Sequence, residues 1–187
     1  MSLAIVVASL LLSPAVSQQK KPKPVTNGKN NLVILQSEGG SFSIEGPKGW
    51  IADRKVGRRL GVCCVYYAKG SYATAETILY PNIVTKAPGR ATVQALMDSD
   101  LAAFRKNNPG MTYVDGDIPF NKRTAKLRYF HGVNQGSSEA VAYIDEDKIV
   151  ALVVISSKTE KTLVDALPLL LEVLETYTYG VKAVSLN

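Results

Sequence analysis

Four strand-like runs follow one another in the second half of the chain, with only short polar breaks between them. Strands joined by so few residues pair in opposite directions, because a parallel pair needs a crossover of a dozen residues or more. The last two runs are separated by Glu146-Asp147 alone and predict a hairpin. The four expected strands are Met111–Phe120, Thr124–His131, Ser138–Asp145 and Lys148–Ser156.

Four shorter strands are expected upstream of this block. Val62–Ala68 (VCCVYYA) is apolar at both alternating sets of positions, which predicts a strand covered on both faces. Pro81 predicts an edge position or a bulge in the strand that contains it. The other three expected strands are Leu32–Gln36, Ser41–Glu45 and Thr77–Lys86. Between the strands, the segment Ile51–Leu60 is rich in basic residues, which indicates an exposed loop.

Two segments have helical periodicity instead. In the first, Thr92 is a plausible N-cap, and Asn107-Asn108-Pro109-Gly110 ends the helix. The second runs from about Thr159 to Tyr177, and Pro168 within it should kink the helix or divide it in two. Their apolar stripes need a sheet to pack against. The stripes are Val93, Leu96, Met97, Leu101 and Phe104, then Leu163, Leu167, Leu170, Leu171, Leu174 and Tyr177.

The order of elements predicts the fold class. Helices packed on an antiparallel sheet of about six to eight strands make an α+β fold. A chain of 187 residues is expected to hold one such domain, which we place at residues 32–187.

The N-terminal segment predicts export. Leu3 to Leu12 is an apolar stretch of about ten residues, long enough for a signal peptide but too short to span a bilayer. Pro14 breaks the stretch, and Ala15-Val16-Ser17 supplies the small residues that a signal peptidase reads. We therefore expect a signal peptide at residues 1–17, a mature terminus at Gln18, no membrane span after cleavage, and a periplasmic or extracellular protein.

A basic linker is expected at residues 18–31, because Pro, Lys, Asn and Gly dominate there and almost nothing apolar is left to bury. Removing its four lysines from the formal net charge of +6 leaves +2 for the rest of the chain. A flexible basic tail favours weak contact with an anionic surface over nucleic-acid recognition, for which interleaved aromatic residues are missing. The lysines are Lys20, Lys21, Lys23 and Lys29.

One motif adds a family resemblance. Phe42-Ser43-Ile44-Glu45-Gly46-Pro47-Lys48-Gly49-Trp50 is similar to the opening strand and the following corner of PsbP-like proteins. Asn82-Ile83-Val84, the helix at Thr92, the strand Lys126–His131 and the closing hairpin with its helix are consistent with that superfamily, over residues from about 40 to 178. The resemblance implies an α/β/α sandwich that lacks catalysis and binds a protein partner.

The charged clusters suggest where a partner could bind. Arg54, Lys55, Arg58 and Arg59 are the candidate partner-binding surface. In a second basic cluster, Lys126 and Arg128 share one strand face, which we therefore expect to be exposed. Trp50 is expected to be a core anchor, since a tryptophan beside a glycine corner is more often packed than exposed.

Small-ligand or divalent-metal binding is the alternative function, and a hydrolase is a less favoured one. Carboxylates cluster at Asp115 and Asp117 and at Asp145, Glu146 and Asp147, although neither run is a complete Ca²⁺ loop and no cofactor motif occurs. A hydrolase would have to use His131, the single histidine, with a serine or cysteine within hydrogen-bond reach.

The two cysteines, Cys63 and Cys64, are adjacent. Neighbouring side chains of a strand point to opposite faces, so we expect the two thiols to be buried, reduced and out of each other's reach.

Overall fold

The computed structural model describes residues 31–87, 92–133 and 136–181. The predicted signal peptide and nearly all of the predicted linker, with its four lysines, lie outside the described residues. Within them no helix is long and apolar enough to cross a membrane.

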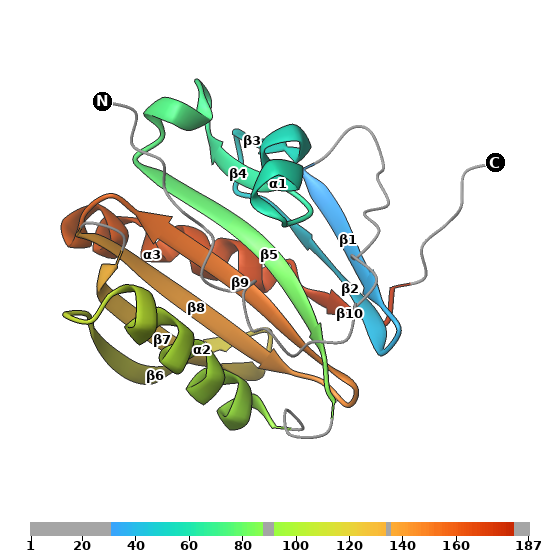
Figure 1. The fold of residues 1–187 in the computed structure, drawn as a ribbon. Helices are drawn as coiled ribbons and strands as arrows, with labels where there is room; N and C mark the ends of the chain where they lie inside the picture. The colour runs from blue at the N-terminus through green and yellow to red at the C-terminus, as the bar shows by residue number, and fades with distance from the viewer. Residues whose placement is uncertain (1–30, 88–91, 134–135, 182–187) are drawn as a thin grey trace.

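A seven-stranded antiparallel sheet forms the centre of the molecule (Figure 1), which confirms the predicted α+β class. The predicted hairpin is present: β8 pairs with β9 from Ser138↔Ser157 to Asp145↔Val150. In spatial order the strands are β3 (Trp50–Asp53), β4 (Val65–Ala68), β5 (Thr77–Thr85), β9 (Ile149–Ser157), β8 (Ser137–Asp145), β7 (Arg123–Val133) and β6 (Thr112–Phe120).

The first two strands, with one near the C-terminus, make a second and smaller sheet. Its order is β1 (Leu32–Ser37), β2 (Gly40–Glu45) and β10 (Thr178–Tyr179), all antiparallel. Sequence reasoning placed β1 and β2 in one sheet with the others and did not find β10, whose two residues are too few to give a periodic signal.

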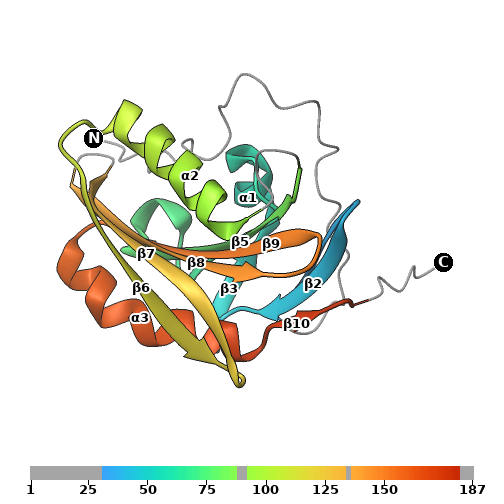
Figure 2. The ribbon, with the colours of Figure 1, turned by 90° about the horizontal axis from the view of Figure 1, so that it is seen from below.

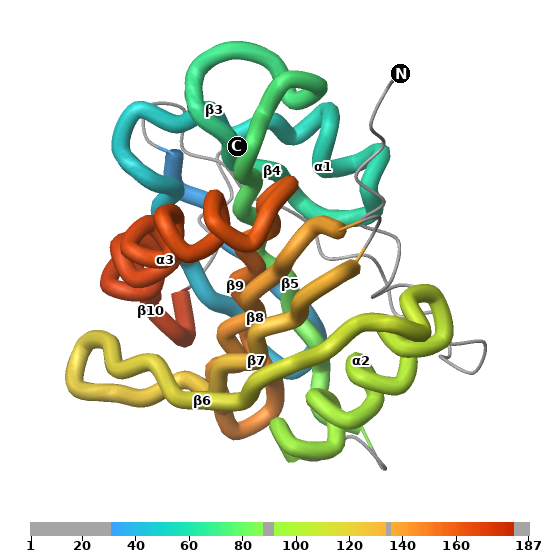
Figure 3. Tube along the Cα trace, turned by 90° about the vertical axis from the view of Figure 1, so that its left-hand side faces the viewer, coloured from blue at the N-terminus to red at the C-terminus, as the bar shows by residue number. Residues whose placement is uncertain are grey.

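The two long helices lie on opposite faces of the large sheet (Figure 2). The α2 helix (Val93–Asn107) covers one face, and α3 (Glu160–Glu175) covers the other, which it shares with the small sheet. Figure 3 shows the same two helices on either side of β7, β8 and β9. Every residue of β9 and all but the last of β8 are buried, as strands between two layers must be.

Both helices begin where the sequence predicts. Thr92 Oγ1 accepts a hydrogen bond from the Ala95 N–H at 3.1 Å, and Thr159 Oγ1 accepts one from the Thr162 N–H at 3.1 Å. The α3 helix continues through Pro168 as one element, so the expected division is absent. Leu171 is exposed, although it was placed on the buried stripe.

The segment from 50 to 64 differs most from the prediction. Instead of a loop it forms β3 and the short helix α1 (Arg54–Leu60), and a 3₁₀ turn (Tyr72–Thr74) follows β4. The Asp53 carboxylate caps α1 by accepting the Val56 N–H at 2.8 Å, and Gly61 ends it at a φ of 79°. Cys63 and Cys64 precede β4 rather than belonging to it.

The corner after β2 packs tightly against the sheet. A Cβ on Gly46 would lie 2.2 Å from the Tyr66 ring, so only glycine fits there. The Asn31 side-chain amide donates to the Trp50 carbonyl at 2.6 Å, and the Asn31 carbonyl accepts the Tyr66 hydroxyl at 2.8 Å. Trp50 is half-buried at the rim of the core on the α3 side, which corrects its assignment as a core anchor.

Pro81 lies beyond the last residue pair that joins β5 to β4, and β5 pairs with β9 alone at that point. Although β5 is an inner strand of the sheet, Pro81 has a paired neighbour on one side only, as a residue of an edge strand has. A proline is tolerated there because its missing N–H faces the side of β5 where β4 has ended.

Candidate functional site

The candidate partner surface is the outer face of α1. Val56 and Gly57 are its buried residues and attach the helix to the sheet. Lys55, Arg58 and Arg59 are exposed at i, i+3 and i+4 spacing, which puts their side chains on one face. Arg54 is half-buried beside them. All four residues predicted from the sequence are thus brought together, on a helix rather than on a loop.

Gly57 explains why this segment is helical despite its composition. A Cβ at this position would lie 2.5 Å from Cys64 Cα and 2.6 Å from Cys64 N. The absence of a side chain lets α1 rest directly on the backbone before β4. Glycine disfavours an isolated helix, so sequence reasoning penalised a segment that tertiary contact holds in place.

No ion pair within 4.0 Å involves the α1 cations in the described parts of the chain. Asp53, which immediately precedes the helix, is committed to the Val56 N–H and to the Tyr67 hydroxyl, and these hydrogen bonds keep its pKa below the ordinary value. Six of the twelve described cations outside α1 are paired with carboxylates. They are Lys86, Arg123, Lys126, Arg128, Lys158 and Lys161.

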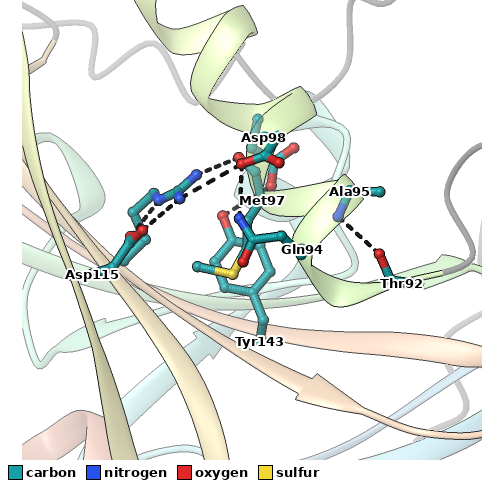
Figure 4. A network of polar contacts seen from close by, with 9 residues as sticks. Thr92, Gln94, Ala95, Met97, Asp98, Asp115 and Tyr143 are labelled. Atoms are coloured by element: carbon teal, nitrogen blue, oxygen red, sulfur yellow. Dashed lines mark hydrogen bonds and ion pairs between the residues drawn. The ribbon is translucent and has the colours of Figure 1, made fainter.

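A buried polar network lies between α2 and the sheet (Figure 4). Arg128, on β7, has a side chain only 2% exposed and binds the Asp115 carboxylate with two nitrogens, at 2.6 and 2.7 Å. The third nitrogen of the Arg128 guanidinium donates a hydrogen bond to the Met97 carbonyl of α2 at 2.5 Å. The predicted exposure of this strand face is therefore wrong at Arg128 and right at Lys126, because α2 covers the first position and not the second.

Asp115 makes the burial of the Arg128 charge possible. A buried cation needs a hydrogen-bonded counter-charge, and the two-nitrogen contact provides one in the favoured geometry. The same contact lowers the pKa of Asp115 and raises that of Arg128. Asp98 of α2 adds a more distant carboxylate, 4.0 Å from Arg128.

Two further acids lie between α2 and the sheet, one on the helix and one on β8. Asp100 is buried and accepts the Tyr143 hydroxyl at 3.0 Å. Glu139 is buried on β8, and desolvation raises its pKa to about 8, with the charge of Asp100 acting in the same direction. The Ser156 hydroxyl is opposite Glu139 in the register, but it has no hydrogen bond of ordinary geometry, so we assign the shift chiefly to burial.

Four of the five carboxylates considered for a metal are held by cations of the chain, and the fifth, Asp147, is exposed. Asp117 contacts Lys126 at 2.9 Å, and Asp145 contacts Lys86 at 2.6 Å. Glu146 accepts from Arg123 at 2.7 Å and from the Tyr177 hydroxyl at 2.8 Å. Over the described ranges, no three His, Cys, Asp or Glu side chains are grouped as metal ligands would be.

His131 lies at the far end of β7, next to the start of α3. Its Nδ1 is 3.4 Å from Glu160 Oε1, and its ring lies 4.5 Å from that of Tyr129. These contacts are with a carboxylate and an aromatic ring, and neither supplies the serine or cysteine nucleophile that the hydrolase hypothesis requires.

The two cysteine side chains are in contact. Their Sγ atoms are 3.4 Å apart, and both residues are buried with free thiols. The expectation that they point apart is wrong, because they lie in the turn between α1 and β4, where the alternation of a strand does not apply.

Comparison with known proteins gives a structural likeness. Neither a protein-family model nor a curated protein matches the chain. It is similar to the cyanobacterial PsbP of Synechocystis sp. PCC 6803, at 10% identity over 89% of this chain and 96% of that chain, with a TM-score of 0.41. It is also similar to the Ran-binding protein Mog1p of Saccharomyces cerevisiae, at 10% identity over 84% and 94%, with a TM-score of 0.47. The resemblance noted from the sequence recurs here, as one of fold alone.

Proposed function

We propose that this chain is an exported, non-catalytic domain that binds an acidic protein partner through the basic face of α1. The observation that carries the proposal is the concentration of unpaired cations on α1. Four cations stand together on this seven-residue helix, with no carboxylate of the described residues within 4.0 Å, whereas the other unpaired cations of the described residues stand singly or, at Arg105 and Lys106, as one pair.

The attachment of α1 supports the same function. A binding surface gains affinity when its side chains start from a fixed backbone, because less freedom is lost on association. The Asp53 cap, buried Val56 and the close approach at Gly57 fix the helix, so that the basic side chains extend from a rigid base. Exposed charges of this kind mainly increase the rate of association with a partner of opposite charge.

Charge reversal tests the proposal. The triple variant Lys55→Glu, Arg58→Glu, Arg59→Glu should lose the proteins captured from an extract of the native source, and a matched triple reversal at Lys106, Lys122 and Lys148 should retain them. These three control lysines are exposed and carry no ion pair. Equal capture by both variants would place the binding surface elsewhere.

Binding to anionic vesicles is a separate outcome of the same variants. If the wild-type protein binds phosphatidylserine vesicles and captures no protein, the partner is a membrane surface and the proposal fails. A domain that starts at residue 31 keeps the Asn31 hydrogen bonds to the corner after β2. It should melt as the mature protein does and should associate more slowly with the partner, since the lysines before it contribute charge and little apolar surface.

Export is tested independently of binding. Expressed with residues 1–17 in a bacterium that has a secretion pathway, the protein should be recovered outside the cytoplasm with Gln18 as its first residue. Intact-mass measurement identifies that terminus. A full-length chain in the cytoplasm or membrane fraction would contradict the signal peptide.

A further inference from the structure

The thiol pair at Cys63 and Cys64 is unusual for neighbouring residues. Both side chains turn to the same side, and their sulfur atoms are 3.4 Å apart. Cys64 is fully buried, and Cys63 is 6% exposed. The fold therefore holds two sulfur atoms in contact, which an extended strand would have kept on opposite faces.

The sequence position of the pair determines what kind of bond it could form. Consecutive Cα atoms are about 3.8 Å apart, whereas disulfide-bonded residues usually have Cα atoms about 4.4–6.8 Å apart. A bond between neighbours is consequently strained and more readily reduced than an ordinary structural disulfide. Such bonds suit reversible chemistry.

The α1 helix packs directly on the backbone that carries the thiol pair. Gly57 is so close to the Cys64 backbone that a Cβ would collide with it, and the Val62 N–H donates to the Gly57 carbonyl at 3.0 Å. Closing a ring between Cys63 and Cys64 requires the peptide unit between them to rotate. Because Gly57 rests on that backbone, α1 has to adjust with it.

We propose that Cys63 and Cys64 form a reversible vicinal disulfide whose closure shifts α1. The oxidant is a disulfide-containing compound such as oxidised glutathione. Cys63, the more exposed thiol, loses its proton and attacks one oxidant sulfur, which releases a first thiolate and leaves a mixed disulfide. Cys64 then loses its proton and displaces the second thiolate. The two cysteines give up two electrons and two protons, and the oxidant becomes two thiols.

The thiol pair is protected while the protein is reduced. The thiol–thiol hydrogen bond to Cys64 and burial both raise the pKa of Cys63, so little nucleophilic thiolate is present in the closed structure. Oxidation should accordingly be slow in the native protein and should proceed as α1 opens.

The test equilibrates the protein in glutathione redox buffers, both natively and during refolding, followed by acid quenching and intact mass. We expect a monomer that has lost two hydrogen masses and a peptide Leu60–Lys69 with an internal link. The equilibrium constant for closing the bond should be larger in the folded protein than in denaturant, because folding brings the two sulfurs together. Cys63→Ser and Cys64→Ser are the matched controls and cannot lose the two hydrogens.

Three results would overturn the disulfide: two free thiols after refolding in the most oxidising buffer, a persistent glutathione adduct, or an equilibrium constant for closing the bond that is no larger in the folded protein than in the unfolded one.

The shift of α1 has its own readout. Hydrogen exchange of the Gly61 and Val62 amides, which bond to α1 carbonyls, should be faster in the oxidised protein. Unchanged exchange in a fully oxidised sample would refute that coupling. None of these readouts requires the partner.

Discussion

Arg128 and Glu139 show how much of this molecule depends on single residues that the sequence places in ordinary positions. Arg128 lies in a strand of alternating pattern and reads as surface charge, yet it is among the largest fully buried side chains. Glu139 lies at the start of a buried strand. Both are ionisable residues beneath α2, and their burial has opposite consequences. The charge of Arg128 is compensated by Asp115, whereas the charge of Glu139 is suppressed by protonation.

Removing the counter-charge of Arg128 should therefore be costly. Asp115→Ala leaves the buried guanidinium with the Met97 carbonyl and with Asp98 at 4.0 Å. Breaking a fully buried pair costs about 3–5 kcal/mol, and an exposed pair contributes less than about 1 kcal/mol. Because the Asp115 side chain is 45% exposed and Asp98 remains near Arg128, we expect an intermediate loss of about 2 kcal/mol. Chemical denaturation measures the loss.

Asp117→Ala is the matched control for that measurement. It removes the exposed partner of Lys126 from the same strand, where both side chains are more than half exposed, and should change stability by less than about 1 kcal/mol. Equal effects of the two variants would show that water reaches Arg128 and that the network is not a buried one.

Glu139 should make stability depend on pH. The pKa of Glu139 is about 8 in the folded protein, against an ordinary value of 4.5 for a glutamate, so between these limits the folded state holds a proton that the unfolded chain has lost. The free energy of unfolding should then fall by about 1.4 kcal/mol for each pH unit as pH rises through this window. Below the window the contribution is constant.

Glu139→Gln removes this titration, so the variant should show a flatter dependence of unfolding free energy on pH than the wild-type protein. Denaturant titrations at several pH values between 4.5 and 8 measure the difference. Contributions from all other groups are common to both proteins and cancel in the comparison. Parallel curves for the two proteins would mean that Glu139 is ionised in the fold.

At the scale of elements, α1 is the part that sequence reasoning could not find. Periodicity predicted α2, α3 and the strands β5 to β9 closely, because each is long enough to show its buried face. The seven residues of α1 contain a glycine and three arginines, and their helical state depends on the cap at Asp53 and on contact with Cys64. The sequence shows that the four cations are close together in the chain, but only the fold shows that Lys55, Arg58 and Arg59 share one helix face and that none of the four has an ion pair in the described residues.

Gly57→Ala tests that dependence. Alanine favours a helix by about 1 kcal/mol over glycine, but its Cβ would meet backbone atoms of Cys64 that cannot move aside. We expect a net loss of about 1–3 kcal/mol and a lower melting temperature. Gly116→Ala, on β6, has nothing within 4 Å of the added Cβ and should be close to neutral. A Gly57→Ala protein that melts as high as wild type would show that α1 is loosely attached.

At the scale of the whole molecule, one strand pair joins two locally formed halves. The strands β3 to β5 pair in chain order, and so do β6 to β9. The halves meet where β5 pairs with β9 along its whole length, and the first pair, Thr77 and Ser157, is 80 residues apart in the sequence. Contacts between residues so far apart in the sequence slow folding. The entropy cost of closing the loop comes first, before the contacts contribute any favourable energy.

We therefore expect the β5–β9 pairing to form in the rate-limiting step and the small sheet to form afterwards. Leu79→Ala on β5 should mainly slow folding, whereas Leu35→Ala on β1, the same chemical change at an equally buried site, should mainly speed unfolding. Stopped-flow folding and unfolding rates over a range of denaturant distinguish the two. A larger folding defect in Leu35→Ala would reverse the order.

This strand order has a consequence for synthesis in the cell. A ribosome delivers β3, β4 and β5 well before β9, and residue 157 must leave the exit tunnel before β5 can find its partner. The central sheet cannot close while most of the second half is still being made. A nascent chain with this strand order therefore stays open during most of its synthesis, which is the state that the proposed export requires.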